Sequence, residues 1–290
     1  MKKILTIIAI LVLSALATAA QNQKSTSKML YHNGAVLTGI QHVYVIWYGC
    51  WQSNCGLMGD PNSEVIIANF LSTIGDTPYM GINLTYPDSL GQPATSSLTY
   101  GGSVDDSSYL HGVELTDADI QGIIYDQLSN FRLPQDPFGI YVVIASADVS
   151  SIATGFCTPG APPYHKSADI NGGLTSYIFL GNPNRCPSVA GPQFFANNTR
   201  LLTPHNSYAG DTLASNLAHA LDTTLTNPFG DGWFDRYGLE NADKCQNTFG
   251  QTYLAPNGAR ANINLGAAAG DYLIQQNWVN DRKPRCAMSR

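Results

Sequence analysis

The chain has 290 residues, a formal net charge of −6 and only 12% charged residues. An acidic chain without a run of basic residues lacks the charge that nucleic-acid binding requires, so we expect no nucleic-acid partner. Its 27 glycines, 16 prolines and 15 tyrosines, together with the low charge, are typical of a folded, loop-rich extracellular protein rather than a disordered one.

The first residues predict an export signal. Lys2 and Lys3 form a short positive segment, residues 4–16 are apolar, and Ala17-Thr18-Ala19 is a small-residue cleavage site. The apolar run is too short to span a membrane, and no later segment approaches the length of a spanning helix. We therefore expect residues 1–19 to be removed as a signal peptide and residues 20–290 to form one secreted domain that does not contact a membrane. An uncleaved anchor is the alternative.

The remaining pattern predicts strands that alternate with helices. Runs rich in β-branched and aromatic residues predict buried strands at residues 42–48, 139–145 and 176–180. Apolar residues at helical spacing predict helices at residues 64–74 and 116–130. Weaker patterns predict strands at residues 79–86, 97–100 and 272–279. The alternation favours an α/β fold, a single domain with a largely buried central sheet flanked by helices and with disulfide-stabilised loops.

Residues 211–225 predict an amphipathic helix. One face is apolar: Leu213, Ala214, Leu217, Ala218, Leu221 and Leu225. The opposite face gathers polar side chains: Asn216, His219, Asp222, Thr223 and Thr226. His219 and Asp222 are three residues apart, so their side chains can meet. Asn227-Pro228 ends the helix.

An acidic loop follows this helix. Asp231, Asp235, Glu240 and Asp243 fall within thirteen positions of each other, among several aromatic residues. A loop of this kind beside a histidine-bearing helix could hold a metal ion or a polar ligand.

Six cysteines behind an export signal predict three disulfides. Fifteen pairings are possible. We favour the pairs Cys50–Cys55, Cys157–Cys186 and Cys245–Cys286. The first pair is close in sequence, and the last would tie the acidic loop to the C-terminus. A zinc cluster is the rival interpretation, but the chain has no C-x2-C pair.

Two metal sites are conceivable. Zinc would take His165 and His219 with a carboxylate from the set Asp222, Asp235 and Asp243. Calcium would take the oxygen atoms of the acidic loop, although its spacing does not match an EF-hand. No H-E-x-x-H motif is present, because Ala220 and Thr223 follow His219. A solvated helix face with an ordinary histidine, and a structured loop without an ion, explain the same residues.

Other chemistries have weaker support. The chain has no G-x-S-x-G serine motif and no phosphate-binding G-x-x-x-x-G-K-[ST] loop. Some aromatic residues could form a platform for a sugar, although most such residues belong to cores: Trp47, Tyr48, Trp51, Trp233 and Trp278.

Several segments resemble a known family. They are residues 29–48 (MLYHNGAVLTGIQHVYVIWY), Gly155-Phe156-Cys157, residues 216–232 (NLAHALDTTLTNPFGDG) and Asn277-Trp278-Val279. In this order they resemble the exordium-like, or phosphate-induced protein one, family of plant cell walls and bacteria, and we identify the chain as a bacterial-type member. The resemblance implies an extracellular protein, linked to growth or carbon status in plants, without an established enzymatic activity.

The segment around His219 is also similar to a more distant group of bacterial proteins that look like metallopeptidases. These have a His-Glu helix before a T-[DN]-P turn. His219 matches their histidine, but Ala220 replaces the glutamate that would act as the general base, and Asn227 stands where aspartate is common. The similarity thus implies a degenerate site.

Two classes of function stay open. The favoured one is a secreted exordium-like protein that binds a cell-wall glycan or a protein partner. The other is a metal-dependent hydrolase, with zinc or calcium, built around His219. Whether the protein is an enzyme is undecided at this point.

Overall fold

The computed structural model describes residues 27–52, 54–55, 60–190 and 202–290. The expected signal peptide at residues 1–19 lies outside them. Among the described residues no helix combines the length and apolar character needed to cross a bilayer.

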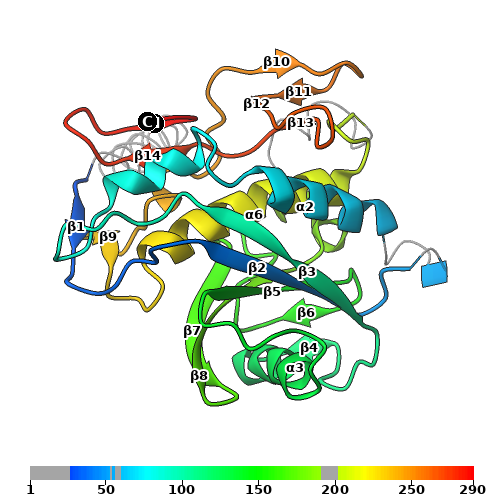
Figure 1. The fold of residues 1–290 in the computed structure, drawn as a ribbon. Helices are drawn as coiled ribbons and strands as arrows, with labels where there is room; N and C mark the ends of the chain where they lie inside the picture. The colour runs from blue at the N-terminus through cyan, green and yellow to red at the C-terminus, as the bar shows by residue number, and fades with distance from the viewer. Residues whose placement is uncertain (1–26, 53, 56–59, 191–201) are drawn as a thin grey trace, which may run out of the picture.

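A five-stranded sheet forms the centre of the molecule (Figure 1). Its strands, in spatial order, are β3 (Leu98–Asp106), β2 (Gln41–Tyr48), β5 (Gly139–Ala145), β8 (Gly173–Leu180) and β7 (Tyr164–Ile170). The first four are parallel, and β7 is antiparallel to β8. Because both faces of β2 and β5 are covered, these strands are continuous apolar runs rather than alternating ones.

Helices cover both faces of the sheet. The α2 helix (Pro61–Thr73) and the α6 helix (Tyr208–Thr226) pack on one face, and α3 (Asp117–Ser129) packs on the other (Figure 1). The remaining helical pieces are short: α4 (Pro187–Ala190), η2 (Met80–Thr85), η3 (Pro183–Arg185) and η4 (Asp243–Cys245). This arrangement confirms the predicted α/β domain with a buried central sheet.

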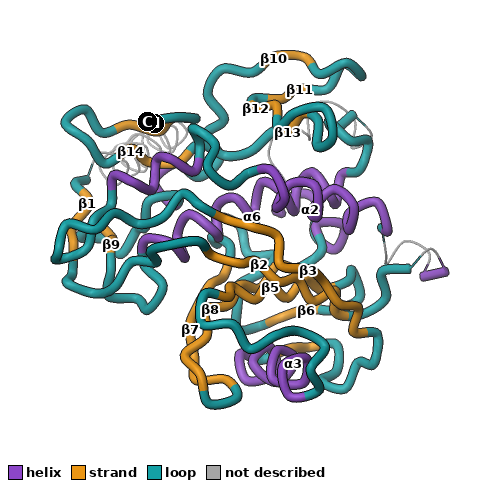
Figure 2. The backbone as a smooth tube through the Cα atoms, viewed as in Figure 1, coloured by secondary structure: helices purple, strands orange, loops and turns teal. Residues whose placement is uncertain are grey.

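Small strand pairs and loops surround this centre. The antiparallel pairs are β1 (Met29–Tyr31) with β9 (Trp233–Asp235), β10 (Tyr253–Leu254) with β11 (Arg260–Ala261), β12 (Ile263–Asn264) with β13 (Asp271–Tyr272), and β14 (Asn277–Val279) with β15 (Arg285–Ala287). A parallel pair joins β4 (Glu114–Leu115) to β6 (Ser150–Ser151). Figure 2 shows that the C-terminal segment beyond α6 is mostly loop with such short strands.

The C-terminal segment covers the face of α6 that points away from the sheet. Tyr272, Ile274 and Trp278 from this segment belong to the same apolar core as the helix. Every residue of α6 except Asn216 is buried as a result. The expectation of a solvated polar helix face is therefore wrong, because residues more than twenty positions away in sequence cover it.

Two predicted strands differ from the structure. Residues 79–86 contain the 3-10 helix η2 instead of a strand, and the predicted closing strand at residues 272–279 is divided between β13 and β14. Both segments pack against α6 or its covering layer rather than joining the sheet, so their apolar residues are buried without strand pairing.

Three disulfides confirm the favoured pairing. Cys50–Cys55, Cys157–Cys186 and Cys245–Cys286 have Cα separations of 5.7, 5.6 and 5.5 Å, within the range that a disulfide bridges. The first closes a short loop after β2. The second ties the segment after β6 to the segment after β8, and the third anchors the C-terminus to η4.

Candidate functional site

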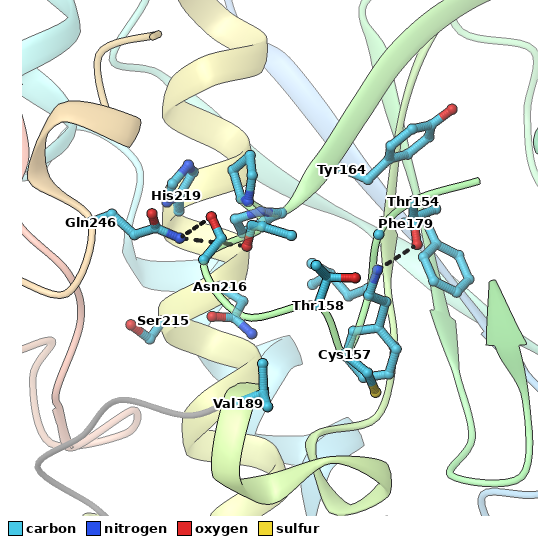
Figure 3. Close-up of a pocket in the computed structure, with 18 of the residues that line it drawn as sticks. Thr154, Cys157, Thr158, Tyr164, Phe179, Val189, Ser215, Asn216, His219 and Gln246 are labelled. Atoms are coloured by element: carbon cyan, nitrogen blue, oxygen red, sulfur yellow. Dashed lines mark hydrogen bonds between the residues drawn. The ribbon is translucent and has the colours of Figure 1, made fainter. Parts of the chain in front are cut away.

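A pocket lies where the carboxyl end of β8 meets α6, and it encloses about 100 Å³ (Figure 3). Carboxyl ends of parallel strands are a frequent place for ligand sites in open α/β sheets. The lining comes from the segment after β6, the end of β8, α6 and the loops near η4 and β14. It includes Thr154, Phe156, Cys157, Thr158, Pro162, Tyr164, Phe179, Val189, Ser215, Asn216, His219, Gln246, Asn247, Phe249 and Gln275.

The outer wall of the pocket is held by covalent and steric constraints. The disulfide Cys157–Cys186 ties residues 154–164 to the chain that follows β8. Gly181 allows the ring of Phe156 to approach, because a Cβ at this position would lie 2.3 Å from the ring. Cys157 and Asn247 both adopt positive φ angles, of 69° and 61°. Such backbone conformations are uncommon outside glycine and concentrate at functional sites.

Gln246 connects the two sides of the pocket. Its Nε2 atom donates to the carbonyl oxygens of Gly160 and Ala161 at 3.3 and 3.4 Å. Figure 3 shows these contacts running from the Gln246 side chain, and Asn216 projecting from α6 into the space between the helix and residue Thr158. Amide groups from two different elements therefore face the same cavity.

His219 forms the inner wall. The side chain lines the pocket and is only 2% exposed. Its Nε2 atom lies 2.9 Å from Oδ1 of Asp243, and its Nδ1 atom lies 3.1 Å from the amide nitrogen of Gln275. Burial raises the pKa of Asp243, but the hydrogen bond and charge of His219, the backbone N–H of Glu240 and the charge of His165 together outweigh burial, so the net pKa lies below the ordinary value. Asp243 is therefore ionised and fixes the orientation of the histidine.

A second histidine–carboxylate pair adjoins the first. His165 Nε2 on β7 lies 2.8 Å from Oε2 of Glu240, and Glu240 also accepts a hydrogen bond from Asn227. The backbone N–H of Glu240 donates to Oδ2 of Asp243 at 3.0 Å, which joins the two pairs. Burial lowers the pKa of His165, but the charge and hydrogen bond of Glu240 and the charge of Asp243 together outweigh burial, so the net pKa is raised.

The predicted metal ligands do not share one centre. His219 and Asp243 do meet, whereas His165 faces Glu240. Asp222 is fully buried on another side of α6, where its Oδ1 atom accepts from Asn83 at 2.7 Å. Asp235 pairs with Lys244 at 3.1 Å. Among the described residues, no group of three or more His, Cys, Asp or Glu side chains is placed to hold a metal ion, zinc or calcium.

The proposed aromatic platform is also not formed. Trp47, Tyr48, Trp51 and Trp278 are buried in the core rather than gathered on a surface. Trp233 packs between Tyr31 and Tyr86. The aromatic side chains that do line the pocket are others, namely Phe156, Tyr164, Phe179 and Phe249.

Sequence reasoning missed the residues that bring the pocket together. Gln246 and Gln275 carry no motif, and they reach the site only because the C-terminal segment folds over α6. Gly155-Phe156-Cys157 is one of the segments that resemble the family, and its cysteine is the signal in the sequence that the neighbouring residues form a fixed wall.

Comparison with known proteins agrees with the resemblance. The family model described as the phosphate-induced protein 1 conserved region matches residues 29–272, which include the central sheet, α6 and most of the pocket. The chain belongs to this family. Protein EXORDIUM of Arabidopsis thaliana is 29% identical over 265 residues, covering 82% of this chain and 79% of the relative. EXORDIUM-like 3 of the same plant is 27% identical, covering 87% and 80%.

Protein PHOSPHATE-INDUCED 1 of Nicotiana tabacum is 27% identical, covering 80% of this chain and 76% of the relative. These relatives are plant proteins, so they support the family but not the expectation of a bacterial-type member. No solved structure matches the chain. What the pocket binds must therefore be inferred from its own chemistry.

Proposed function

We propose that this member of the phosphate-induced protein 1 family is exported, works at the cell wall and binds a glycan in the pocket beside α6. The N-terminal pattern of residues 1–19 supports export. The three disulfides do so as well, because disulfides persist mainly in oxidising compartments. A bacterial-type origin remains part of the proposal; identities below 30% to the plant relatives described above are compatible with it.

The observation that carries the glycan proposal is the chemistry of the pocket lining. Asn216 and Gln246 offer amide groups, which both donate and accept hydrogen bonds. Phe156 and Tyr164 add aromatic rings to the same lining. Sugar hydroxyls both donate and accept, and the CH faces of a sugar ring pack on aromatic surfaces, so a sugar matches both parts of this lining.

The proposed role is binding without hydrolysis. Both ring nitrogens of His219 are occupied, one by Asp243 and the other by Gln275. Ala220 stands where the distant bacterial proteins that look like metallopeptidases have a glutamate, the expected general base. A glycan in the pocket would be held by hydrogen bonds and packing, with no side chain of the described lining placed to activate water.

Substitution of the pocket amides tests this proposal. Asn216→Ala and Gln246→Ala should each weaken binding of a cell-wall oligosaccharide about fivefold to tenfold, the loss expected from one hydrogen bond. Isothermal titration calorimetry of the full secreted protein against a panel of cell-wall oligosaccharides provides the measurement. Asn69→Ala is the matched control, because Asn69 is a half-buried helical asparagine on α2, outside the pocket lining.

Three outcomes would contradict the proposal. Equal weakening by Asn69→Ala would show that the pocket is not the site. Binding of a protein partner but of no oligosaccharide would replace the glycan. Recovery of an external protein that begins at Met1 would contradict cleavage near Ala19.

A further inference from the structure

The pocket lining carries no fixed charge. Of the described residues that form it, none is a lysine, arginine, aspartate or glutamate. Its single histidine, His219, is bound to Asp243 at 2.9 Å. A ligand that enters the pocket therefore exchanges water for amides, hydroxyls, backbone groups and aromatic rings.

The charges directly behind this lining favour the same conclusion. Asp243 and Glu240 are two carboxylates, and the only cationic groups bound to them in the described structure are the side chains of His219 and His165. Even if both histidines were protonated, they would only balance the two carboxylates. Lys166 lies 5.3 Å from the ring of Tyr164, which lines the pocket, but it is paired with Asp117 at 3.3 Å. These described groups beside the lining therefore leave no cation without a carboxylate partner to replace the hydration of an anionic ligand, and burial of an unpaired charge is unfavourable.

From these observations we infer that the ligand is a neutral oligosaccharide rather than a uronate-rich, sulfated or phosphorylated one. The inference rests on the proposed glycan-binding function and specifies its ligand class. Asn216 is the expected determinant, because it is the only residue of α6 that is not buried and it lines the pocket. Its uncharged amide pairs with a sugar hydroxyl as donor or acceptor, whereas a carboxylate at the same place would find no cation.

Two oligosaccharides of equal length, one neutral and one anionic, test the ligand class. Titration with cellohexaose, which is neutral, and with hexagalacturonate, which is anionic, compares them on the same full-length protein. The wild-type protein should bind the neutral probe at least about tenfold more tightly. Asn216→Lys should weaken binding of the neutral probe and strengthen binding of the anionic one. Asn69→Lys, which adds the same charge on α2, should leave the ratio of the two affinities unchanged.

The outcomes separate this inference from the proposed function. If hexagalacturonate binds wild-type protein as tightly as the neutral probe and Asn216→Ala weakens it, the pocket is a glycan site but the ligand class is wrong. If the two lysine variants shift the ratio equally, Asn216 is not the determinant and general electrostatics explains the preference. If neither these probes nor the oligosaccharide panel bind, the proposed function itself is wrong.

Discussion

Replacement of Lys244 by methionine is expected to reduce the free energy of unfolding by about 3–5 kcal/mol, because it leaves a buried carboxylate without its counter-ion. Lys244 Nζ lies 3.1 Å from Oδ2 of Asp235, and both side chains are 0% exposed. Nζ also contacts the hydroxyl of Ser27 at 3.0 Å and lies 4.7 Å from the centre of the Trp278 ring. The pair thus joins the described N-terminal end, β9 and η4.

The charge state of the pair depends on both partners. Burial lowers the pKa of Lys244, and Asp235 opposes this effect without cancelling it. Once the lysine is removed, the carboxylate of Asp235 retains only its neutral hydrogen-bond donors, including the backbone N–H groups of Tyr237 and Leu239. A second change, Asp235→Asn in the Lys244→Met background, should recover part of the loss, because it removes the uncompensated charge.

Urea unfolding monitored by circular dichroism measures both effects. Lys166→Met is the matched control, because Lys166 is 52% exposed and pairs with Asp117 at 3.3 Å. An exposed pair of this kind contributes about 0–1 kcal/mol. If Lys244→Met costs no more than Lys166→Met, the buried pair does not support the fold in the way described.

The stability of the protein should fall as pH rises from about 4 to about 7, because Asp222 holds a proton in the folded state. The carboxyl group is fully buried, and its described hydrogen-bond donor is the neutral amide of Asn83. Burial raises the pKa of Asp222 from 3.8 to about 7. Its Oδ2 atom and the hydroxyl of Tyr79 are both buried without a well-formed hydrogen bond.

Stability falls with rising pH because the folded state binds the proton of Asp222 more tightly than the unfolded state does. Below about pH 4, Asp222 is protonated in both the folded and the unfolded chain, so ionisation costs nothing. Between about pH 4 and 7 only the unfolded chain loses the proton readily, and the folded state becomes progressively less favourable. Above about pH 7 both states are ionised and the loss is complete. The rise in the pKa of Asp222 from 3.8 to about 7 corresponds to about 4 kcal/mol of stability.

Asp222→Asn should reduce this dependence by the part that Asp222 contributes, because asparagine resembles the protonated carboxyl group in shape and cannot ionise. Glu64, whose pKa burial raises to about 7, keeps its own part of the slope. Urea unfolding of the wild type and the variant between pH 4 and 8 provides the comparison. Asp169→Asn, at an exposed position on β7, serves as the control and should keep the slope of the wild type. The same slope in the wild type and in Asp222→Asn would show that this carboxyl group does not cause it.

Elements that depend on residues close together in the sequence were predictable, and elements that depend on residues far apart in the sequence were not. The buried strands β2 and β5 were predictable because their apolar runs are local and uninterrupted. The helices α2 and α3, on opposite faces of the sheet, were predictable from periodicity: three of their four ends fall within one residue of the prediction, and α2 begins three residues earlier than predicted. By contrast, η2 was predicted as a strand because its apolar residues are buried by α6 and the C-terminal segment, which local sequence does not reveal.

The candidate site was predictable only in part for the same reason. His219 was identified because it stands on a periodic helix, and Asp243 because it belongs to an acidic loop. The partnership of His165 with Glu240 joins residues 75 positions apart. Gln246 and Gln275 are ordinary polar residues until the chain folds over α6. The spacing of residues along the sequence does not predict contacts of this kind.

The most direct test of the central claim is to locate the bound glycan by amide chemical-shift mapping. Isotope-labelled protein would be titrated with the neutral oligosaccharide that binds most tightly. The account predicts that the largest shifts fall on residues 154–164, on Asn216 and on Gln246-Asn247, and that Asn216→Ala reduces them. Shifts confined to the β1–β9 pair or to α2, with the pocket residues unchanged, would contradict it.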